Sequence, residues 1–342
     1  MSPGTEAESS LLAGVRLIAG SGRSGTTWIQ DAIAEANELR PVFEPLHPQV
    51  SEIGRRYAYR ALAADDPHPD LERFLAEVVA GRRNRLWTQY RLSGDRLLPR
   101  WRNVRTVEAA RRERLRWRKL WRERRALSLA AQRGTPIVKC IRANLMLPWL
   151  VERCQCRVLL VIRHPAPVVE SRLRLGHRGA WDPEPVLNRY RQDECLHQLT
   201  RDRYREILSR PLGRVEALTL NWVIENQWPI EYARKAGVAV TFYEHLRASH
   251  HEWQRIVGAM DLDRAPSADL LAKPSQQASE GTAHVTSDGH VPSWKRRLTA
   301  EQLESIQRIL DETGFGVYDT GDAMPRVDAR SCGATQVTGR AQ

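Results

Sequence analysis

A run of glycines and hydroxyl side chains around one arginine fills residues 20–27, Gly-Ser-Gly-Arg-Ser-Gly-Thr-Thr. It follows an apolar run of strand length at residues 15–19 and precedes a helical pattern of apolar residues. In such a strand, turn and helix, backbone N–H groups and the helix N-terminus can face one anionic group, and an arginine can add a charge-assisted contact. The loop therefore predicts a phosphate site with these candidate residues: Arg23, Ser24, Gly25, Thr26, Thr27 and Trp28.

The same loop argues against a nucleoside-triphosphate site of the Walker type. Gly20 and Gly25 have the required spacing, but Thr26 occupies the place of the lysine that reaches the β- and γ-phosphates. A nucleotide-binding phosphotransferase of the P-loop kinase kind is therefore an alternative function and not the preferred one. A plain glycine–serine turn that joins a strand to a helix is the structural alternative.

Two candidate proton acceptors and one cation follow further extended runs. Three prolines exclude a helix over residues 40–48, so Glu44 would come at the end of a short strand, with His47 as the competing base. Lys139 ends a buried-type strand at residues 135–140. Ligands of open α/β sheets bind beyond the carboxyl ends of the strands, so we expect these side chains beside the phosphate loop. A salt bridge or turn role for Glu44, and a snorkelling role for Lys139, are the structural alternatives.

An arginine and a serine follow the clearest strand of the chain. Residues 157–162 are almost entirely branched and apolar, and they run directly into Arg163-His164-Pro165. Ser171 lies eight residues after Arg163, within the next predicted helix. Arginine supplies bidentate phosphate recognition and serine supplies a hydroxyl donor, so this pair is a second candidate anion contact.

The elements that must position these groups alternate between strands and helices. Apolar strands are predicted near residues 15–19, 40–48, 135–140, 157–162 and 238–244, with helical patterns between them. The alternation predicts an α/β fold with a central parallel sheet of about four or five strands and helices on both faces.

The domain boundaries follow from shifts in composition. We expect a single domain over residues 15–320 that includes a helical insertion, rich in Arg and Trp, at residues 50–134. Residues 1–14 are expected to be flexible, and residues 321–342 are expected to form a disordered tail.

The composition is typical of a soluble, cytoplasmic protein with anionic partners. Hydrophobic residues make up 42% of the chain, no apolar run approaches the ~18 residues that span a bilayer, and the polar start MSPGTEAESS lacks a signal-peptide pattern. Five cysteines without a Cys-x-x-Cys pair favour reduced thiols. The net charge of +12 favours a phosphorylated cofactor, an acidic glycan, a nucleic acid or an anionic membrane face as partner.

Three of these motifs resemble those of sulfotransferases that use 3′-phosphoadenosine 5′-phosphosulfate (PAPS). Residues 23–28, basic-Ser-Gly-Thr-Thr-Trp, are similar to the 5′-phosphosulfate loop of that family. The Arg163-x-Pro run with Ser171 is similar to its 3′-phosphate motif, and the Glu-Pro-Leu-His run at residues 44–47 resembles a segment of its carbohydrate-modifying members. The resemblance implies a P-loop NTPase-like sulfotransferase fold.

The resemblance covers residues 15–48 and 135–318 and implies roles for single residues. Glu44 would deprotonate the acceptor hydroxyl, and Lys139 would contact the transferring sulfonyl oxygens. Tyr243 matches a family tyrosine that lines the adenine side of the cofactor site.

Two departures from the family pattern affect the site. Cysteine and isoleucine at residues 140–141 replace the threonine and catalytic histidine of cytosolic members, which favours Glu44 as the base. Gly289 matches the glycine of an Arg-Lys-Gly triplet that closes over the 3′-phosphate, but serine and aspartate stand in place of the two cations. Either the lid is weaker or other residues rebuild it, the candidates being Arg296, Arg297, Lys273 and Ser275.

We therefore expect a sulfotransferase that moves the sulfuryl group of PAPS in line to an acceptor hydroxyl, on a carbohydrate or glycolipid, and releases PAP without a metal. The acceptor would be a small molecule or a glycan, and the insertion could contact an anionic membrane surface. Binding of a nucleic acid or another polyanion through the Arg/Trp region at residues 82–125 is the second alternative, although a nucleic acid is not expected as the main partner. The identity of the acceptor and the oligomeric state are left open.

Overall fold

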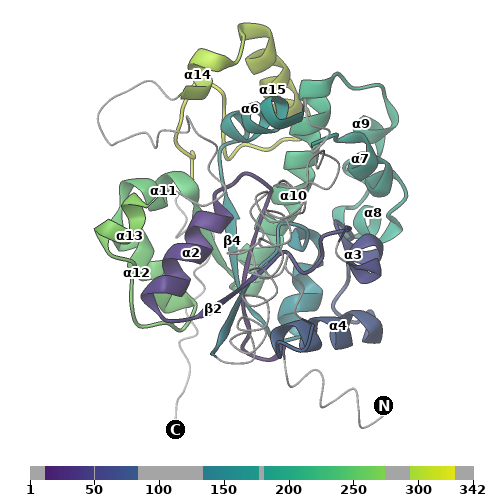
Figure 1. Cartoon of the computed structure of the whole chain (residues 1–342). Helices are drawn as coiled ribbons and strands as arrows, with labels where there is room; N and C mark the ends of the chain where they lie inside the picture. Colours follow the sequence, from purple (N-terminus) through teal and green to yellow (C-terminus); the bar gives the residue numbers. More distant parts are fainter. Residues whose placement is uncertain (1–11, 50, 84–133, 177–180, 274–292, 328–342) are drawn as a thin grey trace, which may run out of the picture.

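Five parallel strands form the central sheet of the part of the chain that the structure describes (Figure 1). The computed structural model describes residues 12–49, 51–83, 134–176, 181–273 and 293–327. The strands are β1 (Arg16–Gly20), β2 (Arg40–Phe43), β3 (Pro136–Lys139), β4 (Arg157–Ile162) and β5 (Ala239–Phe242), and their order across the sheet is β2-β3-β1-β4-β5. β1 is therefore central, since it pairs with β3 on one side and β4 on the other.

Apolar residues alternate along the strands and bury both faces of the sheet. In β4, Leu160 and Ile162 join one hydrophobic core, while Leu159 and Val161 join the other. This period of two is the ordinary geometry of a strand, and burial on both faces is typical of parallel sheets. Each face must then be covered by helices.

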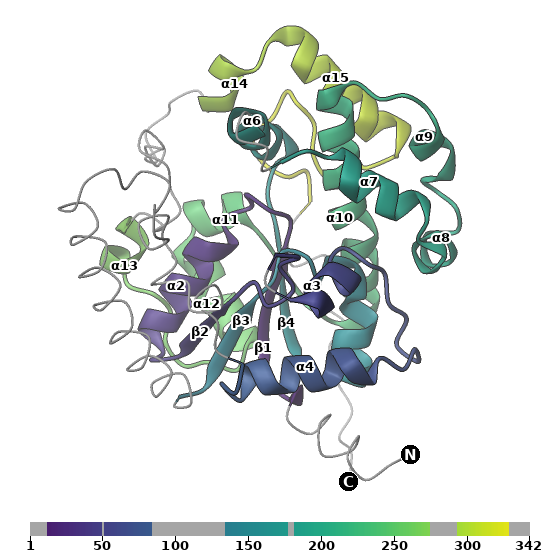
Figure 2. The same cartoon turned by 45° about the vertical axis from the view of Figure 1, so that its right-hand side comes forward.

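Two groups of helices cover the two faces (Figures 1 and 2). One face packs against α2 (Thr26–Ala36), α11 (Tyr243–Ala248), α12 (His250–Ala259) and α13 (Ala268–Ala272). The other packs against α3 (Glu52–Tyr57), α4 (Pro69–Val79), α6 (Pro165–Gly176), α10 (Arg214–Ala236) and α15 (Ala300–Glu312). A 3-10 turn, Asn144–Met146, and a π turn, Trp149–Arg153, also belong to this second layer.

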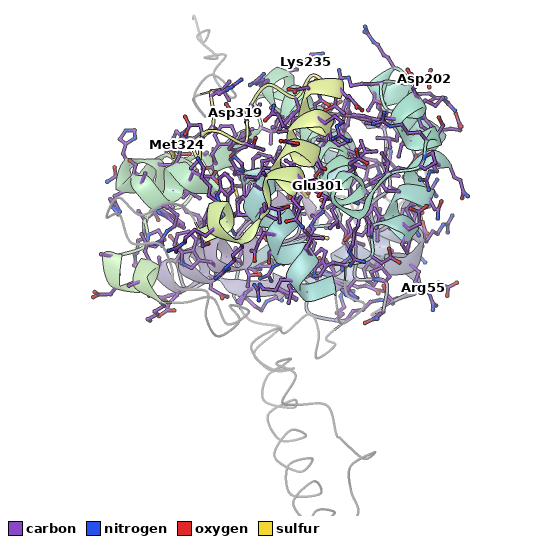
Figure 3. All side chains as sticks on the ribbon, turned by 90° about the horizontal axis from the view of Figure 1, so that it is seen from above. Arg55, Asp202, Lys235, Glu301, Asp319 and Met324 are labelled. Carbon is purple, nitrogen blue, oxygen red and sulfur yellow. The ribbon has the colours of Figure 1, made fainter. Side chains whose placement is uncertain are left out.

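The longest helix, α10, has clear start and stop signals. The Glu216 carboxylate accepts the Gly213 N–H at 2.9 Å, and Gly237 ends the helix with a φ of 68°. The remaining short helices are α7 (Glu184–Arg191), α8 (Glu194–Thr200), α9 (Arg205–Ser209) and α14 (Ser293–Arg297). Seen from above, the exposed side chains of Asp202 and Lys235 lie at the periphery, as solvated charges do (Figure 3).

The predicted α/β class, the parallel sheet and the helices on both faces are confirmed, but some boundaries were wrong. Tyr243 was placed in the last strand, whereas it begins α11. Leu12, assigned to a flexible terminus, is only 2% exposed, and Val327, assigned to a disordered tail, packs against the core. Most of the Arg/Trp insertion, residues 84–133, lies outside the described residues. Within those that are described, no helix is long and apolar enough to cross a membrane.

Candidate active site

The chemically active side chains meet at the carboxyl edge of the sheet. Glu44 directly follows β2, Lys139 ends β3, and the glycine-rich loop follows β1. Arg163 follows β4 and Tyr243 follows β5. Since all five strands are parallel, their carboxyl ends lie on one side, which is where open α/β sheets bind ligands.

The loop between β1 and α2 is shaped to bring its backbone close to a ligand. A Cβ on Gly20 would lie 2.5 Å from the Val161 carbonyl oxygen, so only glycine fits between the strands there. Asn144 holds the same residue, because its Oδ1 accepts the Gly20 N–H at 2.9 Å. Gly25 has a φ of 84° and caps α2 without a side-chain hydrogen bond, so the first N–H groups of the helix are left to an anion.

Arginines from three elements crowd this loop. Arg23 has a φ of 78°, and its Nε donates to Ser171 Oγ at 2.9 Å. Arg163 Nη1 donates to the Arg23 carbonyl oxygen at 3.0 Å. Burial lowers the pKa of Arg23 to about 10, helped by the positive charges of Arg163, Arg174 and Arg172, while Glu170 opposes the shift. Burial is the main cause of this shift, and the neighbouring arginines add positive charge around Arg23, which a bound anion would offset.

Two aromatic rings lie beside Gly25. A Cβ on that glycine would approach the Tyr243 ring to 2.6 Å, and the Arg163 guanidinium stands 4.3 Å from the centre of the same ring. Trp28 packs edge-on against Tyr243 with a centroid separation of 5.8 Å. The two rings meet at an angle of 65°, so the Tyr243 ring and the Arg163 guanidinium lie next to the glycine-rich loop with Trp28 behind them.

Glu44 sits in a buried ion cluster. Its carboxylate lies 2.7 Å from Lys139 Nζ and 2.6 Å from Arg142 Nη1, and it accepts the Ile141 N–H at 3.0 Å. Burial would raise the pKa of Glu44, but the two cations and these hydrogen bonds outweigh it and hold the pKa below its ordinary value. Lys139 is itself nearly inaccessible, and its ammonium lies 4.2 Å from the centre of the Phe43 ring. The salt-bridge alternative for Glu44 therefore describes a real contact, and it leaves the carboxylate ionised.

His47 and Glu44 share one pocket of about 240 Å³. Burial lowers the pKa of His47 to about 4, and Arg142 adds to the shift. The imidazole is therefore neutral near pH 7. The pocket also reaches Lys139 and the aromatic side chains of Tyr59 and Trp181.

Three residues of the loop and the pocket have a left-handed backbone conformation. Among the described residues, eight other than glycine have a positive φ, and Arg23, Glu44 and Tyr59 are three of them, with Glu44 at 44° and Tyr59 at 63°. Such conformations cost about 1–3 kcal/mol each and tend to occur at functional sites. The other five lie outside the loop and the pocket, so the strain at Arg23, Glu44 and Tyr59 adds only modest support for a functional role of this region.

Sequence reasoning missed the residues that join the loop to the pocket. Arg172 is 2% exposed and donates to the Gly22 carbonyl oxygen, to Asn221 Oδ1 and to Glu225 Oε2. Trp181 packs on Gly22, where a Cβ would come within 2.4 Å of its ring. The available signal was a pair of polar residues, Asn221 and Glu225, one helical turn apart and separated by an apolar run at residues 222–224.

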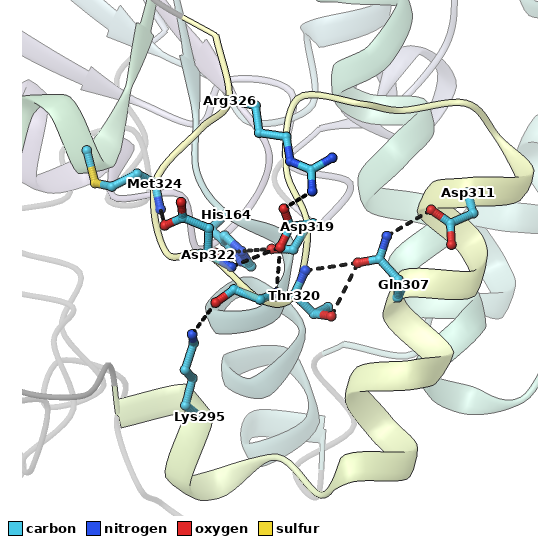
Figure 4. A network of polar contacts seen from close by, with 10 residues as sticks. His164, Lys295, Gln307, Asp311, Asp319, Thr320, Asp322, Met324 and Arg326 are labelled. Atoms are coloured by element: carbon cyan, nitrogen blue, oxygen red, sulfur yellow. Dashed lines mark hydrogen bonds and ion pairs between the residues drawn. The ribbon is translucent and has the colours of Figure 1, made fainter.

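The C-terminal segment braces the residue after Arg163 (Figure 4). His164 Nε2 donates to the carbonyl oxygens of Asp319 and Asp322, at 2.9 and 3.0 Å. Trp294 stacks on the His164 ring with a centroid separation of 4.8 Å. Burial lowers the pKa of His164 to about 4, so its ring is neutral and serves as a fixed support.

The structure thus brings together the predicted loop residues, Arg163, Ser171 and Tyr243 on one side of the edge, and Glu44, His47 and Lys139 on the other. Gly289 lies outside the described residues, as does Ser275. Two of the other proposed lid cations form ion pairs. Lys273 pairs with Glu35 of α2. Arg297 lies 3.4 Å from Glu170, the residue directly before Ser171. No group of three or more potential metal-ligating side chains was found among the residues described.

Comparison with known proteins gives little information about function. No protein-family model matches the chain, and no curated protein does. A solved structure, the sulfotransferase domain from the curacin biosynthetic pathway, aligns with a TM-score of 0.40 and 13% sequence identity, over 88% of this chain and 98% of that one. A likeness of this size assigns no function by itself, so the function has to be argued from the site.

Proposed function

We propose that this protein transfers the sulfuryl group of PAPS to a hydroxyl of a small-molecule or glycan acceptor. The observation that carries the proposal is the contact set of Arg23, Arg163 and Ser171 on a glycine-rich loop whose helix lacks a capping side chain. Arg163, Arg172 and Arg174 add positive charge around Arg23, which favours an anionic ligand there. A molecule with phosphate groups at both ends of an adenosine would supply the negative charge.

The residues present fit the parts of PAPS. The first N–H groups of α2 and Arg23 would hold the 5′-phosphosulfate, and Arg163 with Ser171 would hold the 3′-phosphate. The ring of Tyr243, next to Gly25, would support the adenine. Thr26 in place of a lysine makes the same loop a poor site for a nucleoside triphosphate.

The ion cluster can serve the transfer itself. PAPS supplies the sulfuryl group and leaves as PAP. Glu44 would take the acceptor proton as the new O–S bond forms, since its lowered pKa keeps it ionised near neutral pH. Lys139, 2.7 Å away, would contact the oxygens that gain negative charge as the S–O bond to the phosphate breaks. His47 could accept the proton in its neutral form, but with a pKa of about 4 it is a weak base and ranks second.

A cytoplasmic location belongs to the same proposal. The four cysteines that the structure describes are all unpaired thiols, and burial raises the pKa of Cys140, Cys154 and Cys156. Thiols of this kind persist in a reducing compartment.

Calorimetric binding of PAP tests the proposal, with ADP as the nucleotide that lacks a 3′-phosphate. We expect PAP to bind more tightly than ADP, and Arg163→Ala to weaken PAP about 10- to 100-fold while ADP changes less, because a charge-assisted contact to the 3′-phosphate is lost. Arg308→Ala is the matched control, since Arg308 pairs with Glu216 on the surface. Equal binding of PAP and ADP, or no binding of either, would contradict the proposal.

A further inference from the structure

The pocket that holds Glu44 and His47 would receive the acceptor if Glu44 is the base, and its charged lining residues balance although the chain as a whole is strongly basic. The side chains that line it include three cations and three carboxylates: Lys139, Arg142, Arg172, Glu44, Asp182 and Glu225. His47, also in the lining, is neutral near pH 7. The excess of basic residues that gives the chain a net charge of +12 therefore lies outside this pocket.

The buried charges of the pocket are already paired with each other. Glu44 contacts both Lys139 and Arg142, and Glu225 Oε2 lies 2.9 Å from Arg172 Nη2. An anionic group on an acceptor would have to lose its water without finding an unpaired buried cation, which is costly. A cationic group would find only Asp182, whose exposed carboxylate is screened by water and attracts the cation weakly. The pocket therefore disfavours both anionic and cationic acceptors.

The side chain of Asn221 offers a hydrogen-bond donor, its amide nitrogen, to the pocket. Arg172 has only donors, so the atom of Asn221 that faces its Nη1 at 2.9 Å is the carbonyl oxygen Oδ1. Its amide nitrogen, Nδ2, has no hydrogen-bond partner within the described ranges, and Asn221 lines the pocket. One helical turn further along α10, Glu225 adds a carboxylate, which is an acceptor only.

The Asn221 amide and the Glu225 carboxylate lie next to the glycine-rich loop. Arg172, which both residues contact, also donates to the Gly22 carbonyl oxygen at 3.1 Å. Trp181 packs against Gly22 and lines the same pocket. A ring held between Trp181 and α10 would thus have its hydroxyls beside the loop, as transfer requires.

We propose that the pocket takes an uncharged ring with neighbouring hydroxyls, such as a neutral sugar residue, and that Asn221 and Glu225 bind two of its hydroxyls. One hydroxyl accepts from Asn221 Nδ2, and its neighbour donates to Glu225. Glucuronic acid, glucosamine and simple phenols fit less well, because the first two are charged and the third lacks the second hydroxyl. This inference rests on the proposed sulfuryl transfer and specifies its acceptor.

The first test is a panel of acceptors in the presence of PAPS, with PAP release as the readout. Methyl glycosides of glucose, galactose and mannose represent neutral rings, methyl glucuronoside and methyl glucosaminide represent charged ones, and 4-nitrophenol lacks the diol. We expect kcat/KM for the best neutral glycoside to exceed that for every other probe by at least about tenfold. If a charged probe or the phenol reacts best, or if no neutral glycoside reacts although PAP binds, the inference is overturned while the proposed function stands. If PAP does not bind, both fall.

The second test converts the amide donor into an acceptor. Asn221→Asp keeps an oxygen for Arg172 but replaces Nδ2, and it gives the pocket a net negative charge. We expect KM for the neutral glycoside to rise about tenfold, the preference to shift toward methyl glucosaminide, and PAP affinity to stay unchanged. Asn188→Asp is the matched control, because the exposed Asn188 also accepts from an arginine, Arg191, but lies outside the pocket. An unchanged KM in Asn221→Asp, or an equal rise in Asn188→Asp, would overturn the inference.

Discussion

Replacement of Glu44 by glutamine is expected to lower both the stability of the protein and its rate of transfer. The Glu44 side chain is 2% exposed, and those of its two cationic partners, Lys139 and Arg142, are 4% and 11% exposed. Removal of the carboxylate charge leaves two buried cations without a counter-ion. Breaking a buried pair in this way costs about 3–5 kcal/mol, so we expect the free energy of unfolding to fall by that amount.

Urea unfolding of the two proteins at several pH values measures this effect. The pKa of Glu44 is lowered in the fold, so its stabilising contribution is fully present above its ordinary value of 4.5 and is lost as the pH falls through the folded pKa. The difference between wild type and Glu44→Gln should therefore be constant near neutral pH and shrink under acid conditions. The double variant Glu44→Gln/Lys139→Met should be less destabilised than the sum of the single variants, by at least about 1 kcal/mol, because both charges of the pair are gone.

The catalytic part of the effect is measured separately. At a temperature where Glu44→Gln remains folded, kcat should fall by at least about 100-fold, as for loss of a general base, while PAP affinity is retained. A stability change below about 1 kcal/mol would refute the buried cluster. Retained turnover in a destabilised variant would leave the carboxylate a structural role alone, and His47 would become the favoured base.

Three further substitutions test other parts of the site. Gly25→Ala must adopt a φ of 84° and pushes against the Tyr243 ring, so PAP affinity should drop by at least about tenfold in calorimetry; an unchanged affinity would contradict the close approach. Ser171→Ala removes the hydroxyl that accepts from Arg23, and we expect PAP binding to weaken about tenfold with the circular dichroism spectrum unchanged; equal losses for ADP would argue against a 3′-phosphate contact. His47→Gln should lower kcat by less than about tenfold if Glu44 is the base, and it should leave the pH–rate profile above pH 5 in place, since the pKa of His47 lies near 4; a loss comparable to that of Glu44→Gln would reverse the assignment.

The sheet could be predicted because each strand carries a strong local signal. Residues 158–162 are branched and apolar, and a short run of this kind is typical of a strand that is buried on both faces of a parallel sheet. The order of the strands has no such local signal, since it depends on which neighbours pair across loops of very different length. The end of the last strand was misjudged for a related reason. Tyr243 has a high β-propensity, but here it begins α11, and its ring packs against Gly25.

The loop and the pocket residues Glu44, His47 and Lys139 could be located from the sequence, whereas the remaining wall of the pocket could not. Glycines and hydroxyls around Arg23 are contiguous in the sequence, so their chemistry is visible without a fold. Arg172, Trp181 and Glu225 come from different elements, and each alone is an ordinary arginine, tryptophan or glutamate. Only tertiary packing shows that one buried guanidinium contacts both the loop and α10.

If the proposed transfer is correct, the order of the strands separates the residues that bind the nucleotide from those that bind the acceptor. On one side of β1, β4 and β5 lead into Arg163 and Tyr243, which face the proposed nucleotide; on the other side, β3 and β2 lead into Lys139 and Glu44, which face the pocket. A duplicated gene could therefore acquire a different acceptor through substitutions after β2 and β3. The residues after β4 and β5 would continue to bind the same nucleotide. The same separation gives protein engineers a natural boundary for chimaeras, with the loop after β1 as the part that every such chimaera must keep.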